Sequence, residues 1–112
     1  MADIVKVEVA SAIATVTIDR PKALNALDAQ TLDELTAAAL AIDGDPAVRA
    51  VILTGGGEKA FVAGADIASM ANMAVHEARA FSLKGGALAE AIERSPRPWI
   101  AAVNGFALGG GC

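Results

Sequence analysis

The chain has 112 residues and a formal net charge of −4; 54% of its residues are hydrophobic and only 4% are aromatic. This length bounds the chain to one domain. An acidic chain without a cluster of lysine and arginine is a poor nucleic-acid binder, and a single cysteine excludes an internal disulfide framework and paired-cysteine metal sites. We therefore expect neither a nucleic acid nor a metal ion as a partner.

The first residues alternate charged and apolar side chains and lack the basic segment and apolar segment of a signal peptide. No apolar run reaches the roughly 18 residues that a membrane-spanning helix needs. We expect a soluble, cytoplasmic protein without a membrane partner.

The chain opens with two short segments that alternate in polarity. Residues 4–9 (IVKVEV) predict a half-buried strand with Val5, Val7 and Val9 on its inner side. Residues 13–18 (IATVTI) are again β-branched and alternating, so the two segments predict an antiparallel hairpin. In the following DRPKALNAL stretch, Pro21 and Asn25 favour a loop.

A helix is predicted next, with Asp28 as its N-cap. It has apolar residues at helical spacing, namely Leu32, Leu35, Ala39 and Ile42. The DGDP stretch ends it. Residues 48–55 (VRAVILTG) predict a strand that is nearly all apolar, as a strand buried on both faces is.

A second helix is predicted over residues 76–95. Its expected apolar face consists of Ala80, Leu83, Ala87, Leu88 and Ile92. Gly85 and Gly86 each weaken a helix by about 1 kcal/mol relative to alanine, which indicates close packing or a kink there. Residues 99–105 (WIAAVNG) predict a fourth apolar strand that runs into a glycine-rich turn.

Two stretches share one pattern, in which a buried strand runs into a loop of glycine and alanine: AFVAGAD at residues 60–66 and NGFALGGGC at residues 104–112. Small side chains leave the backbone accessible, and free N–H groups at a following helix start bind anions or polarised oxygens. Two such groups that converge form an oxyanion hole. The alternative is a tight turn with close packing. The chain contains neither of the common glycine-rich nucleotide-binding patterns.

Three stretches follow the predicted hairpin in a fixed order: RPKALNAL, AFVAGADI and RPWIAAVNGFALGGGC. In this order and over nearly the whole chain, the sequence resembles the enoyl-CoA hydratase/isomerase family, the crotonases. The resemblance implies an α/β fold of repeated β-β-α units, with residues 1–112 as the N-terminal part of a single domain. It implies that the backbone N–H groups of Ala65 and Gly110 form an oxyanion hole for a thioester carbonyl. It also implies a homotrimer or hexamer in the full-length form.

The resemblance further implies where coenzyme A binds. Lys22, Ala23 and Leu24 are expected to line its pantetheine and nucleotide, and the adenine-side wall is expected to consist of Ala63, Asp66 and Ile67, mostly through backbone. No separate cofactor is expected, because coenzyme A is part of the substrate.

The expected reaction of the parent protein is hydration of 2-enoyl-CoA in fatty acid β-oxidation. In the hydratases two glutamates supply acid and base, the first directly after the cysteine of GGGC, so neither position lies within this chain. We therefore expect the isolated chain to be inactive. The alternatives are double-bond isomerisation, a non-catalytic CoA-thioester-binding module, and an apolar assembly segment that associates through residues 99–103.

Other ionisable residues are expected to play structural or surface roles. Asp66 is predicted to cap a helix, which is compatible with a ligand contact, and Cys112 has no histidine partner nearby in sequence to make it a nucleophile. Solvent-exposed positions are predicted for Glu58, His76, Glu77, Glu90 and Glu93.

Overall fold

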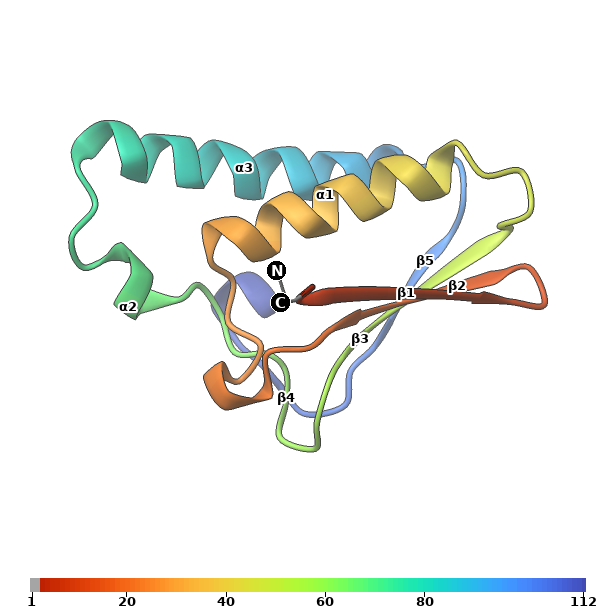
Figure 1. The fold of residues 1–112 in the computed structure, drawn as a ribbon, viewed down its shortest axis with the longest axis horizontal. Helices are drawn as coiled ribbons and strands as arrows, with labels where there is room; N and C mark the ends of the chain where they lie inside the picture. The colour runs from red at the N-terminus through yellow and green to blue at the C-terminus, as the bar shows by residue number, and fades with distance from the viewer. Residues whose placement is uncertain (1–2) are drawn as a thin grey trace.

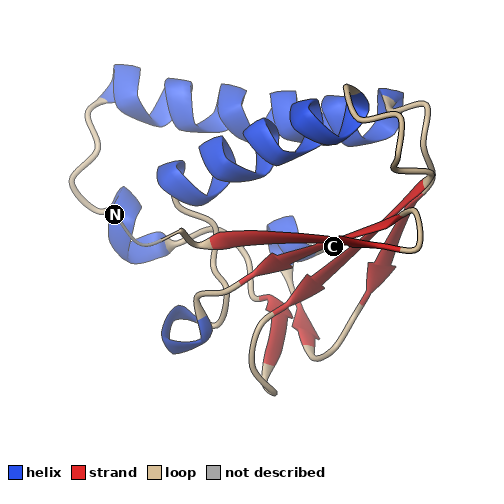
Figure 2. Cartoon of the chain, turned by 45° about the vertical axis from the view of Figure 1, so that its right-hand side comes forward, coloured by secondary structure: helices blue, strands red, loops and turns tan. Residues whose placement is uncertain are grey.

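The computed structural model describes residues 3–112. A four-stranded sheet carries two long helices, α1 and α3, side by side on one face (Figure 1, Figure 2). The strand order is β1-β2-β3-β5. The bounds are Val5–Ala10 for β1, Ile13–Ile18 for β2, Ala50–Gly55 for β3, Trp99–Ala102 for β5, Ala29–Asp43 for α1 and Val75–Arg94 for α3.

The hairpin and the first helix form as the sequence pattern predicts. Strands β1 and β2 form an antiparallel hairpin, and β2, β3 and β5 run parallel. Helix α1 begins at the predicted cap, where the side chain of Asp28 accepts a hydrogen bond from the backbone N–H of Thr31 at 2.8 Å. The apolar residues predicted on α1 are all buried.

The core lies between the helices and one face of the sheet. Alternate residues of β2 point into it, because strand side chains alternate between the two faces. Ala14, Val16 and Ile18 are at most 1% exposed and pack against Leu32 and Leu35 of α1. This layer fixes the sheet relative to the helices.

The opposite face of the sheet is not covered in the described chain, which corrects one expectation, and the edge of the sheet corrects another. Strand β3 is not buried on both faces, since Ile52 is only half-buried and its neighbour in β5, Ile100, is exposed. On the helix face, Val7 and Val9 of β1 are also exposed, because β1 is an edge strand of the sheet.

Helix α3 presents a narrower apolar stripe than its sequence predicts. Leu88 is buried, and Phe81 and Ile92 pack against the core. The predicted Ala80, Leu83 and Ala87 are exposed. The reason is that α3 lies beside α1 in one helix layer, so only one side of α3 contacts α1 and the core (Figure 1).

The glycine pair of α3 is also not explained by close packing. A Cβ added at Gly85 or Gly86 would meet nothing within 4 Å among the described residues. The helix continues through both positions as a single element. Of the two explanations expected for the pair, close packing is therefore wrong for the described residues, and a kink stays a prediction.

Short elements surround the ends of β3 and β5. Strands β4 (Ala60–Val62) and β6 (Phe106–Ala107) form a two-stranded parallel sheet. The other short elements are η1 (Pro21–Ala23), α2 (Ile67–Met70) and η2 (Gly109–Gly111). Within residues 3–112, no helix is both long enough and apolar enough to cross a bilayer.

Candidate active site

The two loops rich in glycine and alanine lie against each other. The N–H of Leu108 donates to the carbonyl of Val62 at 3.1 Å, which continues the pairing of β4 with β6. Gly64 has a φ of +120°, and a Cβ there would lie 3.3 Å from the carbonyl oxygen of Leu108. At Gly111 a Cβ would collide with the carbonyl oxygen of Val62. Close backbone approach therefore explains these two glycines.

Leu27 links the two proposed oxyanion-hole residues. Its N–H donates to the carbonyl of Gly64 at 2.9 Å, and its carbonyl accepts from the N–H of Asp66 at 2.8 Å, so Ala65 is held opposite Leu27. On the other loop, a Cβ built at Gly110 would lie 3.5 Å from Leu27 Cδ1. Ala65 and Gly110 thus both lie against one leucine.

The backbone N–H groups of Ala65 and Gly110 make no hydrogen bond to the part of the chain that the structure describes. Among the hydrogen bonds within residues 3–112, neither group has an acceptor, although the flanking Asp66 and Gly111 both donate to backbone carbonyls. Free N–H groups on neighbouring loops are the requirement for an oxyanion hole. The two N–H groups therefore lack a partner among the described residues, and their role as the donors of an oxyanion hole stays a proposal.

An apolar cavity of about 470 Å³ adjoins this place. Gly110, Gly111 and Cys112 form one part of its wall. The rest is built from apolar side chains of the sheet and the helices, including Leu27, Leu53, Phe61, Leu88 and Ile92. A cavity of this size and composition is typical of small-molecule sites.

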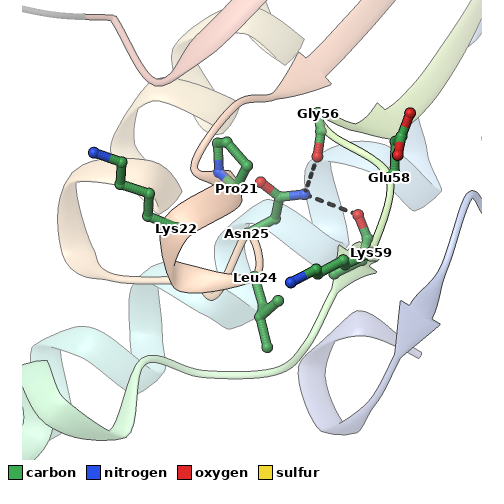
Figure 3. A pocket seen from close by; sticks show the side chains of 8 residues that line it. Pro21, Lys22, Leu24, Asn25, Gly56, Glu58 and Lys59 are labelled. Atoms are coloured by element: carbon green, nitrogen blue, oxygen red, sulfur yellow. Dashed lines mark hydrogen bonds between the residues drawn. The ribbon is translucent and has the colours of Figure 1, made fainter.

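The expected CoA-binding residues fall into two groups. Lys22 and Leu24 line a second hollow of about 410 Å³, together with Asn25, Glu58 and Lys59. Figure 3 shows Lys59 extending toward Leu24, whereas Lys22 points away from Asn25. Lys22 and Ala23 also line a neighbouring hollow of about 340 Å³ with Asp19 and Arg20.

Ala63, Asp66 and Ile67 do not line these hollows. The N–H of Ala63 donates to the carbonyl of Leu24 at 3.1 Å, which ties the two groups together through backbone. Ile67 is 80% exposed at the start of α2. Asp66 caps α2 by accepting from the N–H of Ser69 at 3.3 Å, which confirms the predicted cap.

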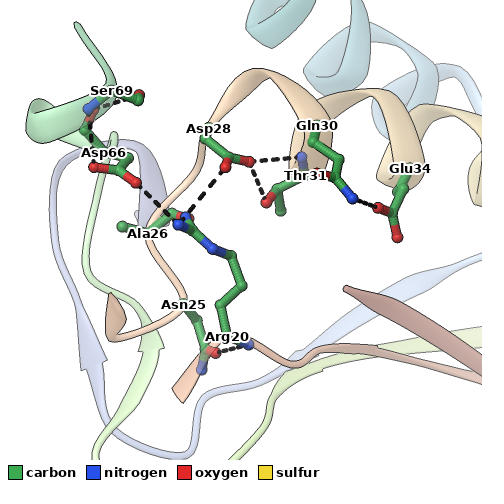
Figure 4. A network of polar contacts seen from close by, with 9 residues as sticks. All are labelled: Arg20, Asn25, Ala26, Asp28, Gln30, Thr31, Glu34, Asp66 and Ser69. Atoms are coloured by element: carbon green, nitrogen blue, oxygen red, sulfur yellow. Dashed lines mark hydrogen bonds and ion pairs between the residues drawn. The ribbon is translucent and has the colours of Figure 1, made fainter. Parts of the chain in front are cut away.

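Two side chains that the sequence pattern left without a role connect these loops (Figure 4). Asn25 is fully buried; its Oδ1 accepts from the N–H of Arg20, and its Nδ2 donates to the carbonyls of Gly56 and Ala60. The guanidinium of Arg20 contacts Ala26, Asp28 and Asp66. Only the turn preference of Asn25 was visible in the sequence, and its φ of 57° confirms that preference.

Two carboxylates near this network are stabilised in their charged form. Burial alone raises the pKa of Asp28, but hydrogen bonds from the hydroxyl and N–H of Thr31 and the charge of Arg20 lower it below its ordinary value. Burial likewise raises the pKa of Glu34, and the N–H groups of Val5 and Ile4 and the amide of Gln30 lower it overall.

The ionisable residues predicted to face solvent do so. His76, Glu77, Glu90, Glu93 and Glu58 are exposed, as predicted. Among the described residues, no group of three or more histidine, cysteine, aspartate and glutamate side chains is placed to hold a metal ion. The described chain therefore offers backbone donors at the site and no carboxylate assigned to acid–base chemistry.

Comparison with known proteins shows the family to which the chain is related. The family model described as enoyl-CoA hydratase/isomerase matches residues 8–112. A crotonyl-CoA hydratase of Syntrophomonas wolfei is 54% identical over 100 residues, and a short-chain-enoyl-CoA hydratase of Clostridium acetobutylicum is 55% identical over 100 residues. The matches cover 89% of this chain but only 38% of each of these relatives.

Solved structures show the same fold. The crystal structure of an enoyl-CoA hydratase from Bacillus anthracis superposes with a TM-score of 0.93 at 37% identity, covering 97% of this chain and 43% of that one. A hydratase from Thermoplasma volcanium superposes with a TM-score of 0.89 at 32% identity, covering 96% of this chain and 43% of that one. The predicted crotonase-type α/β fold is confirmed, and the chain belongs to the enoyl-CoA hydratase/isomerase family.

Proposed function

We propose that a protein containing these residues is a lyase that hydrates 2-enoyl-CoA thioesters to 3-hydroxyacyl-CoA in fatty acid β-oxidation. The observation that carries the proposal is that the backbone N–H groups of Ala65 and Gly110 have no acceptor within residues 3–112, and that Gly110 lies in the wall of an apolar cavity. The relatives named crotonyl-CoA hydratase and short-chain-enoyl-CoA hydratase support the choice of substrate.

The chemistry explains why two such donors are needed. When the oxygen of water bonds to the β-carbon, the electrons of the double bond move through the α-carbon onto the thioester oxygen. Hydrogen bonds from Ala65 and Gly110 stabilise that oxygen, and each donor of this kind is worth about 2.7–4 kcal/mol. The enolate then collapses as the α-carbon takes a proton.

The acid and base for these proton transfers are not assigned to this chain. The described glutamates on α3 and at residue 58 are exposed, and the family resemblance places both catalytic glutamates after Cys112. Losing one acid–base group costs about 10²–10⁴-fold in rate. We therefore predict that the 112-residue chain has no measurable turnover, even where it binds a CoA ester.

Coenzyme A is proposed to lie over the loop that carries η1. Lys22, Ala23 and Leu24 would contact its pantetheine and nucleotide. The backbone from Ala63 to Ile67 would form the adenine-side wall, and the hydrogen bond from Ala63 to Leu24 holds that backbone against the loop. No separate cofactor is needed, because the thioester itself belongs to coenzyme A.

Isomerisation of an enoyl-CoA double bond is the second candidate. It proceeds through the same stabilised enolate and differs in where the acid lies. The matching family model covers both activities in its description. Products distinguish the two, since hydration adds the mass of one water and isomerisation leaves the mass unchanged.

Assembly with further sequence is proposed as well. Exposed apolar side chains lie in β5 and β6 or directly after them, namely Ile100, Val103, Phe106 and Leu108. An exposed apolar patch of this kind marks an interaction surface. We propose that residues 1–112 form the N-terminal part of a single cytoplasmic domain that assembles as a homotrimer or hexamer.

The test uses residues 1–112 joined to the part of the Syntrophomonas wolfei relative that follows the matched region, hereafter the long form. The long form is expected to convert crotonyl-CoA to 3-hydroxybutyryl-CoA, measured as loss of enoyl-thioester absorbance and gain of one water by mass. A folded long form that binds crotonyl-CoA without adding water would contradict the proposal. Robust hydration by the 112-residue chain alone would contradict the placement of the acids.

A further inference from the structure

Arg20 connects the segments that present Ala65. Its Nη1 donates to the carbonyl of Ala26 at 2.6 Å, and its Nη2 contacts carboxylate oxygens of Asp66 at 3.1 Å and Asp28 at 3.6 Å (Figure 4). All three side chains are less than one quarter exposed. Ion pairs in such partly buried positions are screened less by salt than pairs at the surface.

We propose that Arg20 is a positioning residue that sets the direction of the Ala65 N–H toward the thioester oxygen. This inference rests on the proposed function. Ala65 lies between two backbone hydrogen bonds, from Leu27 to Gly64 and from Asp66 to Leu27. Arg20 clamps both sides of this short pairing, because it holds Ala26 and Asp28 on one segment and Asp66 on the other.

The charge of Arg20 holds two carboxylates close together. Asp28 and Asp66 contact the same guanidinium nitrogen, so removing the cation would leave two carboxylates facing each other without a compensating charge. Two carboxylates that lie this close to one guanidinium nitrogen repel each other once the cation is removed. The repulsion acts across the backbone pairing of Leu27 with Ala65. Loss of Arg20 is therefore expected to open the two hydrogen bonds beside Ala65.

The geometric part of the clamp requires an arginine. The planar guanidinium presents two nitrogens at fixed angles, one to a carbonyl and one to the carboxylates. A lysine supplies one charged nitrogen and cannot hold both contacts in the same geometry. Arg20→Lys keeps the charge but loses this second nitrogen.

The backbone of Arg20 is held independently of its side chain. Its N–H donates to Asn25 Oδ1 at 2.8 Å, and its carbonyl accepts from the N–H groups of Ala23 and Asn25 at 2.9 Å each. The loop around Pro21 thus keeps its hydrogen bonds in Arg20→Met. A side-chain variant is therefore expected to fold.

The first readout does not depend on activity. Amide hydrogen exchange in the long form is compared between Arg20→Met and Lys6→Met, a control that removes an exposed ion pair with Asp19. Arg20→Met is expected to speed exchange at the N–H groups of Leu27 and Asp66 by about tenfold or more, as a local opening does. Exchange at both groups equal to that of the control would overturn the proposal, whether or not the long form is a hydratase.

The second readout reports on the thioester. Bound acetyl-CoA with a ¹³C-labelled carbonyl should show a C=O stretch shifted down in the wild type and returned toward its free position in Arg20→Met. With crotonyl-CoA, kcat should fall about 10–100-fold with KM unchanged, less than the full loss of a donor. If the unsubstituted long form neither shifts the carbonyl band of acetyl-CoA nor hydrates crotonyl-CoA, the proposed function is contradicted. Hydrogen exchange at Leu27 and Asp66 would still decide the role of Arg20.

Two further variants keep the test decisive. Arg20→Met combined with Asp28→Asn removes one of the two repelling charges while keeping a good helix cap, and is expected to recover part of kcat and of the carbonyl shift. No recovery would overturn the repulsion argument. If Arg20→Met does not fold, Arg20→Lys is measured instead; an unchanged kcat and carbonyl band in that variant would overturn the requirement for an arginine.

Discussion

Replacing Asn25 with alanine tests the connection between the loop at residues 19–27 and the turn that follows β3. The side chain of Asn25 is fully buried and makes three hydrogen bonds of 2.8–3.0 Å, with the N–H of Arg20 and the carbonyls of Gly56 and Ala60 (Figure 3, Figure 4). Its φ of 57° lies in the left-handed region, which asparagine adopts at a lower cost than alanine.

The expected loss of unfolding free energy combines these two effects. Each hydrogen bond contributes about 0.5–1.5 kcal/mol, so three of them contribute about 3 kcal/mol. The carbonyl of Ala60 keeps a second donor, Asn104 Nδ2 at 3.3 Å, which limits the cost at that atom. Alanine in a left-handed conformation costs about 1–2 kcal/mol more. We expect Asn25→Ala to lose about 4 kcal/mol in all, and Asn25→Gly, which carries no left-handed penalty, about 3 kcal/mol.

Urea denaturation of the long form measures both variants against a matched control. Leu24 has a similar φ of 54°, is 37% exposed and belongs to the same loop, so Leu24→Asn is expected to change stability by less than about 1 kcal/mol. A loss of less than about 1 kcal/mol in Asn25→Ala, or a loss equal to that of Leu24→Asn, would refute this account of the buried amide.

Three further outcomes are expected in the same protein. Gly86→Ala should raise the free energy of unfolding by about 1 kcal/mol, since nothing lies where its Cβ would be; a destabilised variant would show that another segment packs there. Gly111→Ala should prevent or severely weaken folding because of the collision with Val62, whereas Gly110→Ala should fold, as melting curves of the pair would show. Glu34 has a lowered pKa in the folded state, so its contribution is present above its unfolded pKa of about 4.3 and is lost as pH falls through the folded value. Glu34→Gln should therefore be less stable than wild type at pH 7, with a difference that shrinks toward pH 3; a difference independent of pH would contradict the assignment.

The spacing of apolar residues predicted those helices and strands that are long enough for the spacing to repeat. Helix α1 spans four turns, and its buried Leu32, Leu35, Ala39 and Ile42 repeat at the helical spacing. Strand β2 alternates over six residues and lies where predicted. By contrast, α2 has four residues and β6 has two, too few for a period to appear.

The contacts that hold the site could not be predicted in the same way. Arg20 and Asp66 are 46 positions apart, and no spacing rule links a loop arginine to a distant helix cap. The exposed faces of β3 and α3 were also mispredicted, because burial depends on which elements cover a face and not on its hydrophobicity alone. The proposed donors Ala65 and Gly110 came from family resemblance, since alanine and glycine carry no functional side chain.

Substitution at Ala65 tests the oxyanion hole most directly. The proposed group is the backbone N–H, so Ala65→Ser in the long form should keep substantial hydration of crotonyl-CoA. Ala65→Pro removes the N–H and should lower kcat about 10²–10³-fold. Circular dichroism establishes that both variants fold. If both fold and hydrate crotonyl-CoA equally fast, the N–H of Ala65 does not stabilise the thioester oxygen, and the central claim is wrong.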